Sequence, residues 1–207
     1  ESGNSADGSY TYKMQTIPAT FINADVRTVS SGYMHHAVVK SDNSMWMWGR
    51  QYCGEFGNNS TAGSAVPVKV EDDVQIVSAG GQHTAIIKTD GTLWVCGRND
   101  FGQVGDSSVI TRTSFVQIME NVTSVVSGWC VTYAITQDGC LWAWGRNDKG
   151  QLGDGTLDDK WKPVKILEDV HAVNSAKTSC NLAAAIKEDG TLWVWGCNQL
   201  TPIEIDN

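Results

Sequence analysis

Several kinds of segment are missing from this 207-residue chain. No apolar run approaches the roughly 18 residues that a membrane-spanning helix requires, so we expect no membrane insertion. No block of Lys or Arg occurs, and the 15 basic and 23 acidic residues sum to −8, which disfavours binding to nucleic-acid phosphates. A hydrophobic content of 41% with nine Trp residues excludes a disordered chain. The sequence therefore predicts a folded protein with a substantial core.

Signatures of catalysis and of metal binding are absent as well. The six Cys residues form no C-x-x-C pair, and no G-x-S-x-G, H-E-x-x-H or P-loop motif occurs. Asp154, Asp158 and Asp159 lack the spacing of an EF-hand, so we interpret them as part of a solvated loop. The sequence predicts a protein that is not an enzyme and that has no cofactor and no metal.

The cysteines and the first residues give weak signals about the compartment. We expect most of the six thiols to be free, because a chain of this length with nine Trp residues does not need disulfides. Residues 1–16 are polar and predict a flexible N-terminal segment without the features of a signal peptide. The lysine-poor, Asn- and Ser-rich composition favours a secreted or bacterial cell-surface protein, whereas free thiols argue against it.

An internal repeat of 48 residues organises the rest of the chain. A Trp-Gly or Cys-Gly pair recurs at steps of 48, 48 and 51 residues, at Trp48-Gly49, Cys96-Gly97, Trp144-Gly145 and Trp195-Gly196. An acidic turn residue keeps the same register, at Asp42, Asp90, Asp138 and Asp189. The three extra residues of the last unit fall between Ala176 and Asp189. We therefore predict one repeat domain over 17–207, with units of about 17–65, 66–113, 114–161 and 162–207.

Within each unit the apolar residues recur with the two-residue period of β-strands. Residues 85–95 are typical of a hairpin, and the Asp90-Gly91 pair favours a type I′ turn, in which both central residues have positive φ. A β-rich run precedes each hairpin, and a run such as Pro67–Val70 follows it. Four short strands per 48 residues predict an all-β protein made of β-propeller blades, with the strand Trp residues packed between blades.

The run from Leu141 to Thr156 resembles the repeat of the regulator of chromosome condensation family, and Val77–Ala85 fits its other half. The family folds as a β-propeller, usually of seven blades. Its members are mostly interaction scaffolds, among them an exchange factor for a small GTPase, a plant ultraviolet receptor and a bacterial β-lactamase inhibitor. The resemblance implies about four four-stranded antiparallel blades. Cys96 in place of a Trp, and a last unit without the loop after its Trp-Gly pair, depart from the family pattern.

The candidate binding residues directly follow the glycine column that precedes each hairpin, in segments that we expect at one rim of the propeller. They are Tyr33, Met34, Gln82, Trp129 and Lys177. Tyr and Trp are favoured at binding hot spots. The sequence thus predicts a non-enzymatic module that binds an unidentified protein partner through its rim loops. The alternatives are a guanine-nucleotide exchange factor for a small GTPase and an extracellular carbohydrate-binding or enzyme-inhibitor module. We interpret His35 and His83 as structural donors to neighbouring backbone.

The number of repeats leaves the closure of the ring open. Division of 207 by 48 gives about 4.3 repeats, and an arc of four blades leaves two apolar blade faces prone to self-association. Residues 202–205 look like the first strand of a further repeat. The chain is therefore cut from a longer array, pairs with a second copy, or closes a smaller ring.

Overall fold

The computed structural model describes residues 25–177 and 182–205. This part of the chain contains sixteen β-strands and no helix. In the described residues no helix has the length and apolar character needed to cross a membrane. The predicted flexible segment 1–16 and Cys180 lie outside the described residues. Cys53, Cys96, Cys130 and Cys140 are free thiols, as the composition predicts.

The strands form four sheets, each built from four consecutive strands that pair antiparallel in chain order. We call these sheets blades 1 to 4. Blade 1 comprises β1 (Val26–Ser31), β2 (His35–Lys40), β3 (Met45–Gly49) and β4 (Ser64–Glu71). Blade 2 comprises β5 (Val74–Ala79), β6 (His83–Lys88), β7 (Leu93–Gly97) and β8 (Arg112–Met119). Blade 3 comprises β9 (Val122–Ser127), β10 (Val131–Thr136), β11 (Leu141–Gly145) and β12 (Lys160–Leu167). Blade 4 comprises β13 (Val170–Ser175), β14 (Ala183–Lys187), β15 (Leu192–Gly196) and β16 (Gln199–Glu204).

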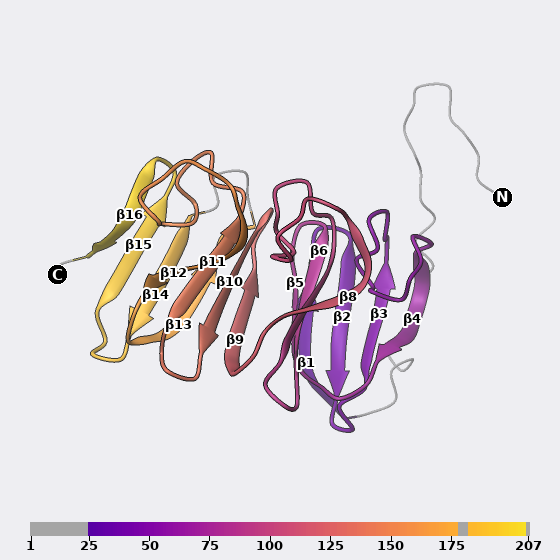
Figure 1. The fold of residues 1–207 in the computed structure, drawn as a ribbon. Coiled ribbons are helices and arrows are strands. Elements are labelled where there is room, and N and C mark those ends of the chain that lie inside the picture. Colours follow the sequence, from indigo (N-terminus) through magenta and orange to yellow (C-terminus); the bar gives the residue numbers. More distant parts are fainter. Residues whose placement is uncertain (1–24, 178–181, 206–207) are drawn as a thin grey trace.

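The blades stand beside one another in chain order, from blade 1 in indigo to blade 4 in yellow (Figure 1). The first strands of successive blades contact one another, so β1, β5, β9 and β13 line the inner side of the arc. The fourth strand of each blade pairs only with the third and forms an outer edge. Edge strands tolerate proline, which explains Pro67, Pro163 and Pro202 in β4, β12 and β16.

Three apolar layers between neighbouring blades form the core. In the first layer Met45 and Met47 of blade 1 pack with Val77 and Ile86 of blade 2. Equivalent layers join blades 2 and 3 and blades 3 and 4, where the large fully buried side chains are Trp144 and Trp195. We call the side of a blade that meets the next blade its forward face, and the side that meets the preceding blade its back face. The predicted packing of Trp residues between blades is confirmed by these two side chains.

The hairpin turn between the second and third strands of each blade is of a different type from the predicted one. A positive φ occurs at Asn43, Gly91, Gly139 and Gly190 but not at the Asp residue before each of them, which excludes a type I′ turn. In the β6–β7 hairpin the amide of Lys88 donates to Thr92 and that of Gly91 donates back to Lys88, giving a three-residue loop. The Asp90 carboxylate accepts from the amide and the hydroxyl of Thr92 at 2.9 and 2.6 Å. These hydrogen bonds to the Asp90 carboxylate favour the three-residue turn over the predicted two-residue turn.

The position of the fourth strand corrects the interpretation of residues 202–205. Residues 202–204 belong to β16, which pairs with β15 and completes blade 4 instead of beginning a further repeat. The same holds in the earlier blades, where the strand that follows the long loop pairs with the third strand of its own sheet. Each of the first three blades consequently ends six residues after the predicted unit, at residues 71, 119 and 167.

The strand registers locate the insertion of the last unit. Val131 pairs with Gly145 in blade 3, and the pairing of Ala183 with Trp195 places Leu182 opposite Gly196 in blade 4. Leu182 is thus the equivalent of Val131, six positions after Ala176 instead of three after Gly128. The three extra residues lie between Ala176 and Leu182.

Candidate functional site: the loop rim

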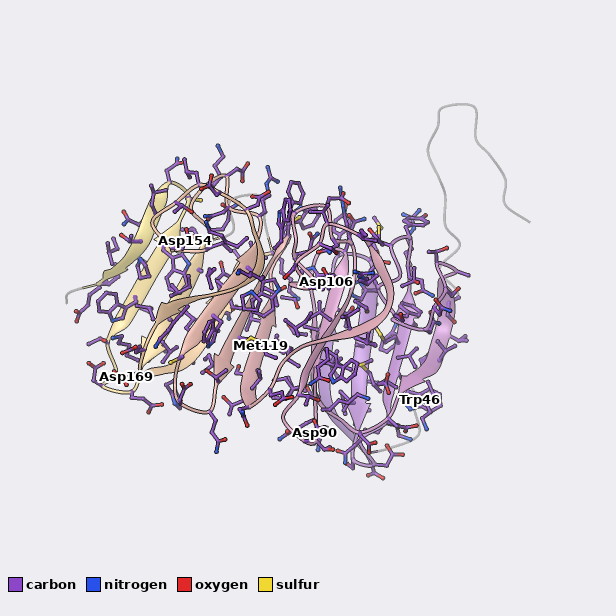
Figure 2. All side chains as sticks on the ribbon, viewed as in Figure 1. Trp46, Asp90, Asp106, Met119, Asp154 and Asp169 are labelled. Atoms are coloured by element: carbon purple, nitrogen blue, oxygen red, sulfur yellow. The ribbon has the colours of Figure 1, made fainter. Side chains whose placement is uncertain are left out.

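Two connections of each of blades 1 to 3 meet at the same end of the strands. The short turn after the first strand and the long loop after the third strand are tied by backbone bonds, such as Arg50 to Met34 at 2.8 Å and Arg98 to Gln82 at 2.8 Å. We call this end the loop rim; the hairpins and the links between blades form the opposite hairpin rim. Figure 2 shows Asp106 and Asp154 at the loop rim and Asp90 and Asp169 at the hairpin rim.

Close backbone contacts between blades build the inner part of the loop rim. The amide of Tyr33 donates to the Gly80 carbonyl at 3.1 Å, and the amide of Gly81 donates to the Gly128 carbonyl at 3.0 Å. A Cβ on Gly81 would lie 2.3 Å from the carbonyl oxygen of Trp129, so only glycine fits there. The turns of blades 1, 2 and 3 are therefore held in a continuous row.

An aromatic pair stands on this row. The rings of Tyr33 from blade 1 and Trp129 from blade 3 meet edge to face, with centroids 4.9 Å apart and planes at 77°. Such a geometry is favourable because the positive ring edge meets the negative ring face. Tyr33 remains 57% exposed, so the pair presents apolar area and a phenol group to solvent. The structure thus brings together two of the predicted site residues that are 96 positions apart.

The other three predicted residues occupy different surroundings on the same rim. Met34 is exposed, and its sulfur lies 3.2 Å from the guanidinium of Arg50. The Gln82 side-chain oxygen accepts a hydrogen bond from Arg98 at 2.6 Å. Lys177 is exposed, and its ammonium donates to the carbonyls of Ser31 and Ala79 at 2.5 and 2.6 Å. Its charge is thereby directed across the inner rim toward blades 1 and 2.

Three arginines of the loop rim were missed by the sequence reasoning. Arg50, Arg98 and Arg146 follow the glycine that ends the third strand of blades 1 to 3, and this column was visible at the 48-residue spacing. Arg98 and Arg146 form ion pairs at 2.6 Å with Asp100 and Asp148, two positions later. In blade 1, Tyr52 takes the place of the aspartate, and Arg50 stacks over its ring at 4.4 Å. The loop rim therefore carries one arginine on each of blades 1 to 3, paired with an aspartate on blades 2 and 3 and with an aromatic ring on blade 1.

The long loops are held by their own polar side chains. The buried Asn147 amide donates to Asp154 and to the carbonyls of Thr156 and Asp158, and the Asp154 carboxylate also pairs with Lys160 at 3.2 Å. Burial raises the pKa of Asp154, but hydrogen bonds from the hydroxyl and the amide of Thr156, and then from Lys160 and Asn147, keep it below its usual range. The prediction of a solvated loop is wrong for Asp154, which is nearly buried and organises the loop.

The histidines and the rim cysteine show no arrangement for chemistry. His35 and His83 are buried, and each bonds through Nε2 to a threonine of the next blade, Thr84 at 2.9 Å and Thr132 at 3.0 Å. The two histidines thus have a structural role, but their hydrogen-bond partners are threonine side chains and not the predicted backbone groups. Burial raises the pKa of the Cys130 thiol to about 11, which disfavours a nucleophilic thiolate. Within the described residues no group of three or more His, Cys, Asp or Glu side chains suits a metal ion.

The repeat pattern matches a known family over more than half of the chain. Two models of the regulator of chromosome condensation (RCC1) repeat match, one over residues 74–103 and 122–151 and the other over residues 42–87 and 138–186. The chain belongs to the RCC1 repeat family. The predicted all-β propeller architecture with about four four-stranded blades is thereby confirmed. No curated protein sequence matches the chain significantly.

Several solved structures show the same fold at low sequence identity. Human WBSCR16 has a TM-score of 0.77 and 19% identity, over 89% of this chain and 55% of that chain. Yeast RCC1 (Prp20), solved bound to Kap60, has a TM-score of 0.78 and 20% identity, over 91% and 50%. Saccharomyces cerevisiae Prp20p, described with its binding properties to Gsp1p and histones, has a TM-score of 0.74 and 19% identity, over 91% and 52%. This chain spans about half the length of these structures.

Proposed function

We propose that this RCC1 repeat chain is a non-enzymatic interaction module that binds a protein partner through the loop rim. The observation that carries the proposal is the Tyr33–Trp129 pair, which joins blades 1 and 3 and leaves Tyr33 largely exposed. Rigid aromatic side chains that offer both apolar area and a polar group are typical anchors of protein interfaces. Structures with the same fold, at low identity, are described together with protein partners.

The surroundings of the pair support recognition of a protein surface. Arg50 and the exposed Tyr52 extend the aromatic area on blade 1, and Arg146 lies over the ring of Phe101 at 4.9 Å on the neighbouring blades. Arginine and aromatic residues are the types enriched at interface centres. The row of close backbone contacts beneath them limits movement of the anchors, so less conformational entropy is lost on binding.

Alanine substitutions at the aromatic pair test this proposal. We expect Tyr33→Ala and Trp129→Ala each to weaken partner capture by at least about tenfold, the effect typical of a hot spot. The measurement is binding of the partner recovered with the wild-type protein, together with the melting temperature of each variant. Tyr33→Phe, which keeps the ring, is the conservative comparison.

A matched control lies at the other end of the blades. His171 is exposed at the hairpin rim, so His171→Ala should leave capture unchanged. Capture that survives both alanine substitutions at unchanged melting temperature would reject the loop rim as the binding surface. Accelerated nucleotide release from a small GTPase, or binding to a glycan array, would instead support one of the two alternatives predicted from the sequence.

A further inference from the structure

The ammonium of Lys177 is a hydrogen-bond donor that the described residues do not fully use. Lys177 stands in the same repeat column as Tyr33 and Trp129, and its ammonium donates to the carbonyls of Ser31 and Ala79. An ammonium group has three N–H donors. Within the described residues these two carbonyls are its only acceptors, so one N–H remains for a ligand.

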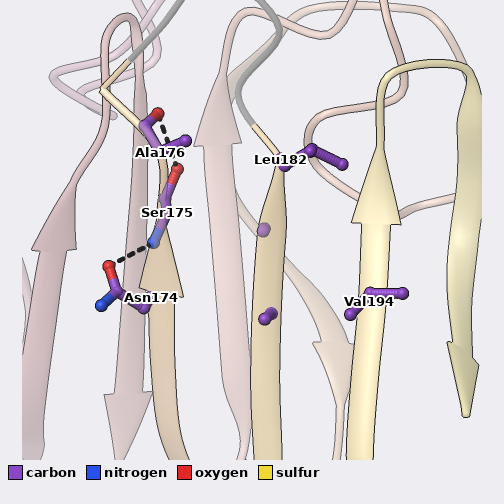
Figure 3. A pocket seen from close by; sticks show the side chains of 7 residues that line it. Asn174, Ser175, Ala176, Leu182 and Val194 are labelled. Carbon is purple, nitrogen blue, oxygen red and sulfur yellow. Dashed lines mark hydrogen bonds between the residues drawn. The ribbon is translucent and has the colours of Figure 1, made fainter. Parts of the chain in front are cut away.

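The backbone that directly precedes Lys177 is fixed by local hydrogen bonds. Figure 3 shows the end of β13, where the Ser175 amide donates to the Asn174 side-chain oxygen at 2.7 Å and the Ser175 hydroxyl donates to the Ala176 carbonyl at 3.5 Å. The Ala176 amide donates to the Leu182 carbonyl at 2.9 Å. The ammonium therefore extends from an ordered strand end, and less conformational entropy is lost when it binds a ligand.

No carboxylate of the described residues offsets the charge of this ammonium. Desolvation lowers the pKa of Lys177, and no acidic group opposes that effect. By contrast, hydrogen bonds to Glu168 and Asp72 raise the pKa of Lys165 and of Lys69, respectively. A partly desolvated charge is unfavourable unless it is paired with a charge of opposite sign. The remaining N–H of Lys177 therefore favours an anionic ligand.

The acidic residues of the chain lie away from this spot. The innermost turns of the loop rim, at residues 31–34, 79–82, 127–130 and 175–177, contain no Asp or Glu. Asp90 and Asp169 lie at the opposite, hairpin rim (Figure 2). In the long loops, carboxylates form the ion pairs Arg98–Asp100, Arg112–Asp106, Arg146–Asp148 and Lys160–Asp154. The inner loop rim is thus a positive spot on a chain with a formal net charge of −8.

The ammonium and the aromatic pair belong to one continuous row of turns. Ser31 lies two residues before Tyr33, and Ala79 lies two residues before Gly81, which packs against the backbone of Trp129. One short segment of a partner can therefore contact both features. The aromatic pair suits an apolar side chain, and a single N–H suits one carboxylate oxygen. A phosphate group is bound best by several charged donors at once, so a carboxylate is the better match.

We propose that the loop rim binds a short acidic segment of its protein partner, with one carboxylate on the Lys177 ammonium and a neighbouring apolar side chain on the Tyr33–Trp129 pair. This inference rests on the proposed function of the loop rim and adds the chemical nature of the partner. The carboxylates of the hairpin rim repel such a segment, so the charge distribution directs it to the loop rim.

Selection of peptides on the immobilised full chain tests this chemistry. The probe is a library of random peptides displayed on phage, and the enriched peptides are identified by sequencing. We expect them to carry Asp or Glu beside an aromatic or aliphatic residue more often than the starting library does. Enriched peptides without an excess of acidic residues, or a selection that enriches no peptide, would overturn the proposal.

A double-mutant cycle tests the contact between the peptide carboxylate and Lys177. An enriched peptide and its form with the acid changed to the corresponding amide are titrated by fluorescence anisotropy against the wild type and Lys177→Met. On the wild type the amide form should bind about tenfold more weakly, and on Lys177→Met the two peptides should bind equally. A structural role of Lys177 alone would weaken both peptides by the same factor, and that result would overturn the proposal.

The controls separate this inference from the proposed function. Lys149 is an exposed lysine of the same rim outside the innermost turns, so Lys149→Met should keep the difference between the two peptides. If the enriched peptides bind Tyr33→Ala and Trp129→Ala as tightly as the wild type, the loop rim is not the binding surface and both proposals fail. If these two variants lose the peptides but the cycle shows no coupling to Lys177, only the acidic segment is rejected.

Discussion

His35 and His83 each join two blades through one buried hydrogen bond to a threonine. The imidazole rings crowd the glycine column next to them: a Cβ on Gly32 would lie 2.4 Å from Cε1 of His35, and one on Gly80 would lie 2.5 Å from Cε1 of His83. This contact explains why the fourth unit differs from the first two units at both positions. It has Ala176 in the glycine column and Leu182 in the histidine column.

The same histidines should make stability depend on pH. Burial is the main cause that lowers the pKa of His35 to about 4 and that of His83 to about 3. The unfolded chain takes up protons at both positions below pH about 6.5, whereas the folded chain does not, so stability is lost as the pH falls from there toward 4. For His35 the loss reaches about 3 kcal/mol. Denaturant unfolding over this pH range measures it.

Glutamine variants separate this effect from that of the carboxylates. In the double variant His35→Gln, His83→Gln the loss of stability between pH about 6.5 and 4 should be much smaller than in the wild type. His171→Gln, at an exposed position, should keep the wild-type slope. An equal slope in the double variant and the wild type would show that the two buried imidazoles do not control acid stability.

At the scale of elements, the long loop of one blade packs against the following blade and belongs to the apolar layer between the two. Gly105 has a φ of +91°, and a Cβ there would lie 2.6 Å from Nε1 of Trp144, the atom that donates to Gln103. Gly153 lies in the same way against Trp195. In the first layer the smaller Cys96 replaces the Trp, and its thiol lies 3.5 Å from the Glu55 carbonyl. The glycines of the loop are therefore required for blade packing.

A pair of alanine substitutions measures this packing. Gly190 also has a positive φ, of +86°, but nothing lies within 4 Å of its Cβ position. Gly190→Ala should lower the free energy of unfolding by only about 1–2 kcal/mol, the cost of a left-handed backbone conformation for alanine. Gly105→Ala should cost at least about 2 kcal/mol more, because Trp144 must also shift. The free energy of unfolding in denaturant gives both values, and equal losses would contradict the role assigned to the loop.

The hairpins show how far the prediction of elements reached. The two-residue period and the Asp-Gly pair predicted a hairpin over residues 85–95, and the observed strands β6 and β7 extend it to residues 83–97. The type of turn was wrong, because the carboxylate of Asp90 bonds to Thr92 and Thr92 accepts from the indole of Trp94 at 2.8 Å. These contacts depend on three side chains at once, and dipeptide preferences do not contain them.

At the scale of the whole molecule, Lys177 links the two ends of the arc. Its ammonium lies on the carbonyls that end β1 and β5, although the residue follows β13. Desolvation lowers the pKa of this lysine because it disfavours the charged form. The two carbonyl oxygens oppose this effect, since they accept hydrogen bonds from the charged ammonium. The link opposes rotation of blade 4 away from blades 1 and 2.

Removal of this ammonium should loosen blade 4. We expect Lys177→Met, which keeps the length of the side chain, to lower the free energy of unfolding by about 2 kcal/mol, as for a hydrogen bond from a charged group. Amide hydrogen exchange in β13 should become faster, and that in β6 should stay unchanged. Lys149→Met, at an exposed position of the same rim, is the control. Unchanged exchange in β13 would show that Lys177 does not hold the arc.

The candidate site was predicted in its members but not in its geometry. Tyr33 and Trp129 follow equivalent glycines in the repeat, which placed both at one rim. Their edge-to-face contact spans a whole blade and depends on Gly81, whose Cβ would meet the backbone of Trp129. The separate role of Lys177 was also hidden, because its partners are backbone carbonyls far away in sequence.

By itself, the sequence determined the all-β class, the positions of the strands, the number of blades and the rim that carries the aromatic residues. These features follow from local periods and from columns that recur every 48 residues. Only the tertiary structure decided which strand completes each blade, which turns the carboxylates select and how Tyr33 meets Trp129. The physical reason is that these outcomes depend on contacts between blades, where distance in space is independent of distance along the chain.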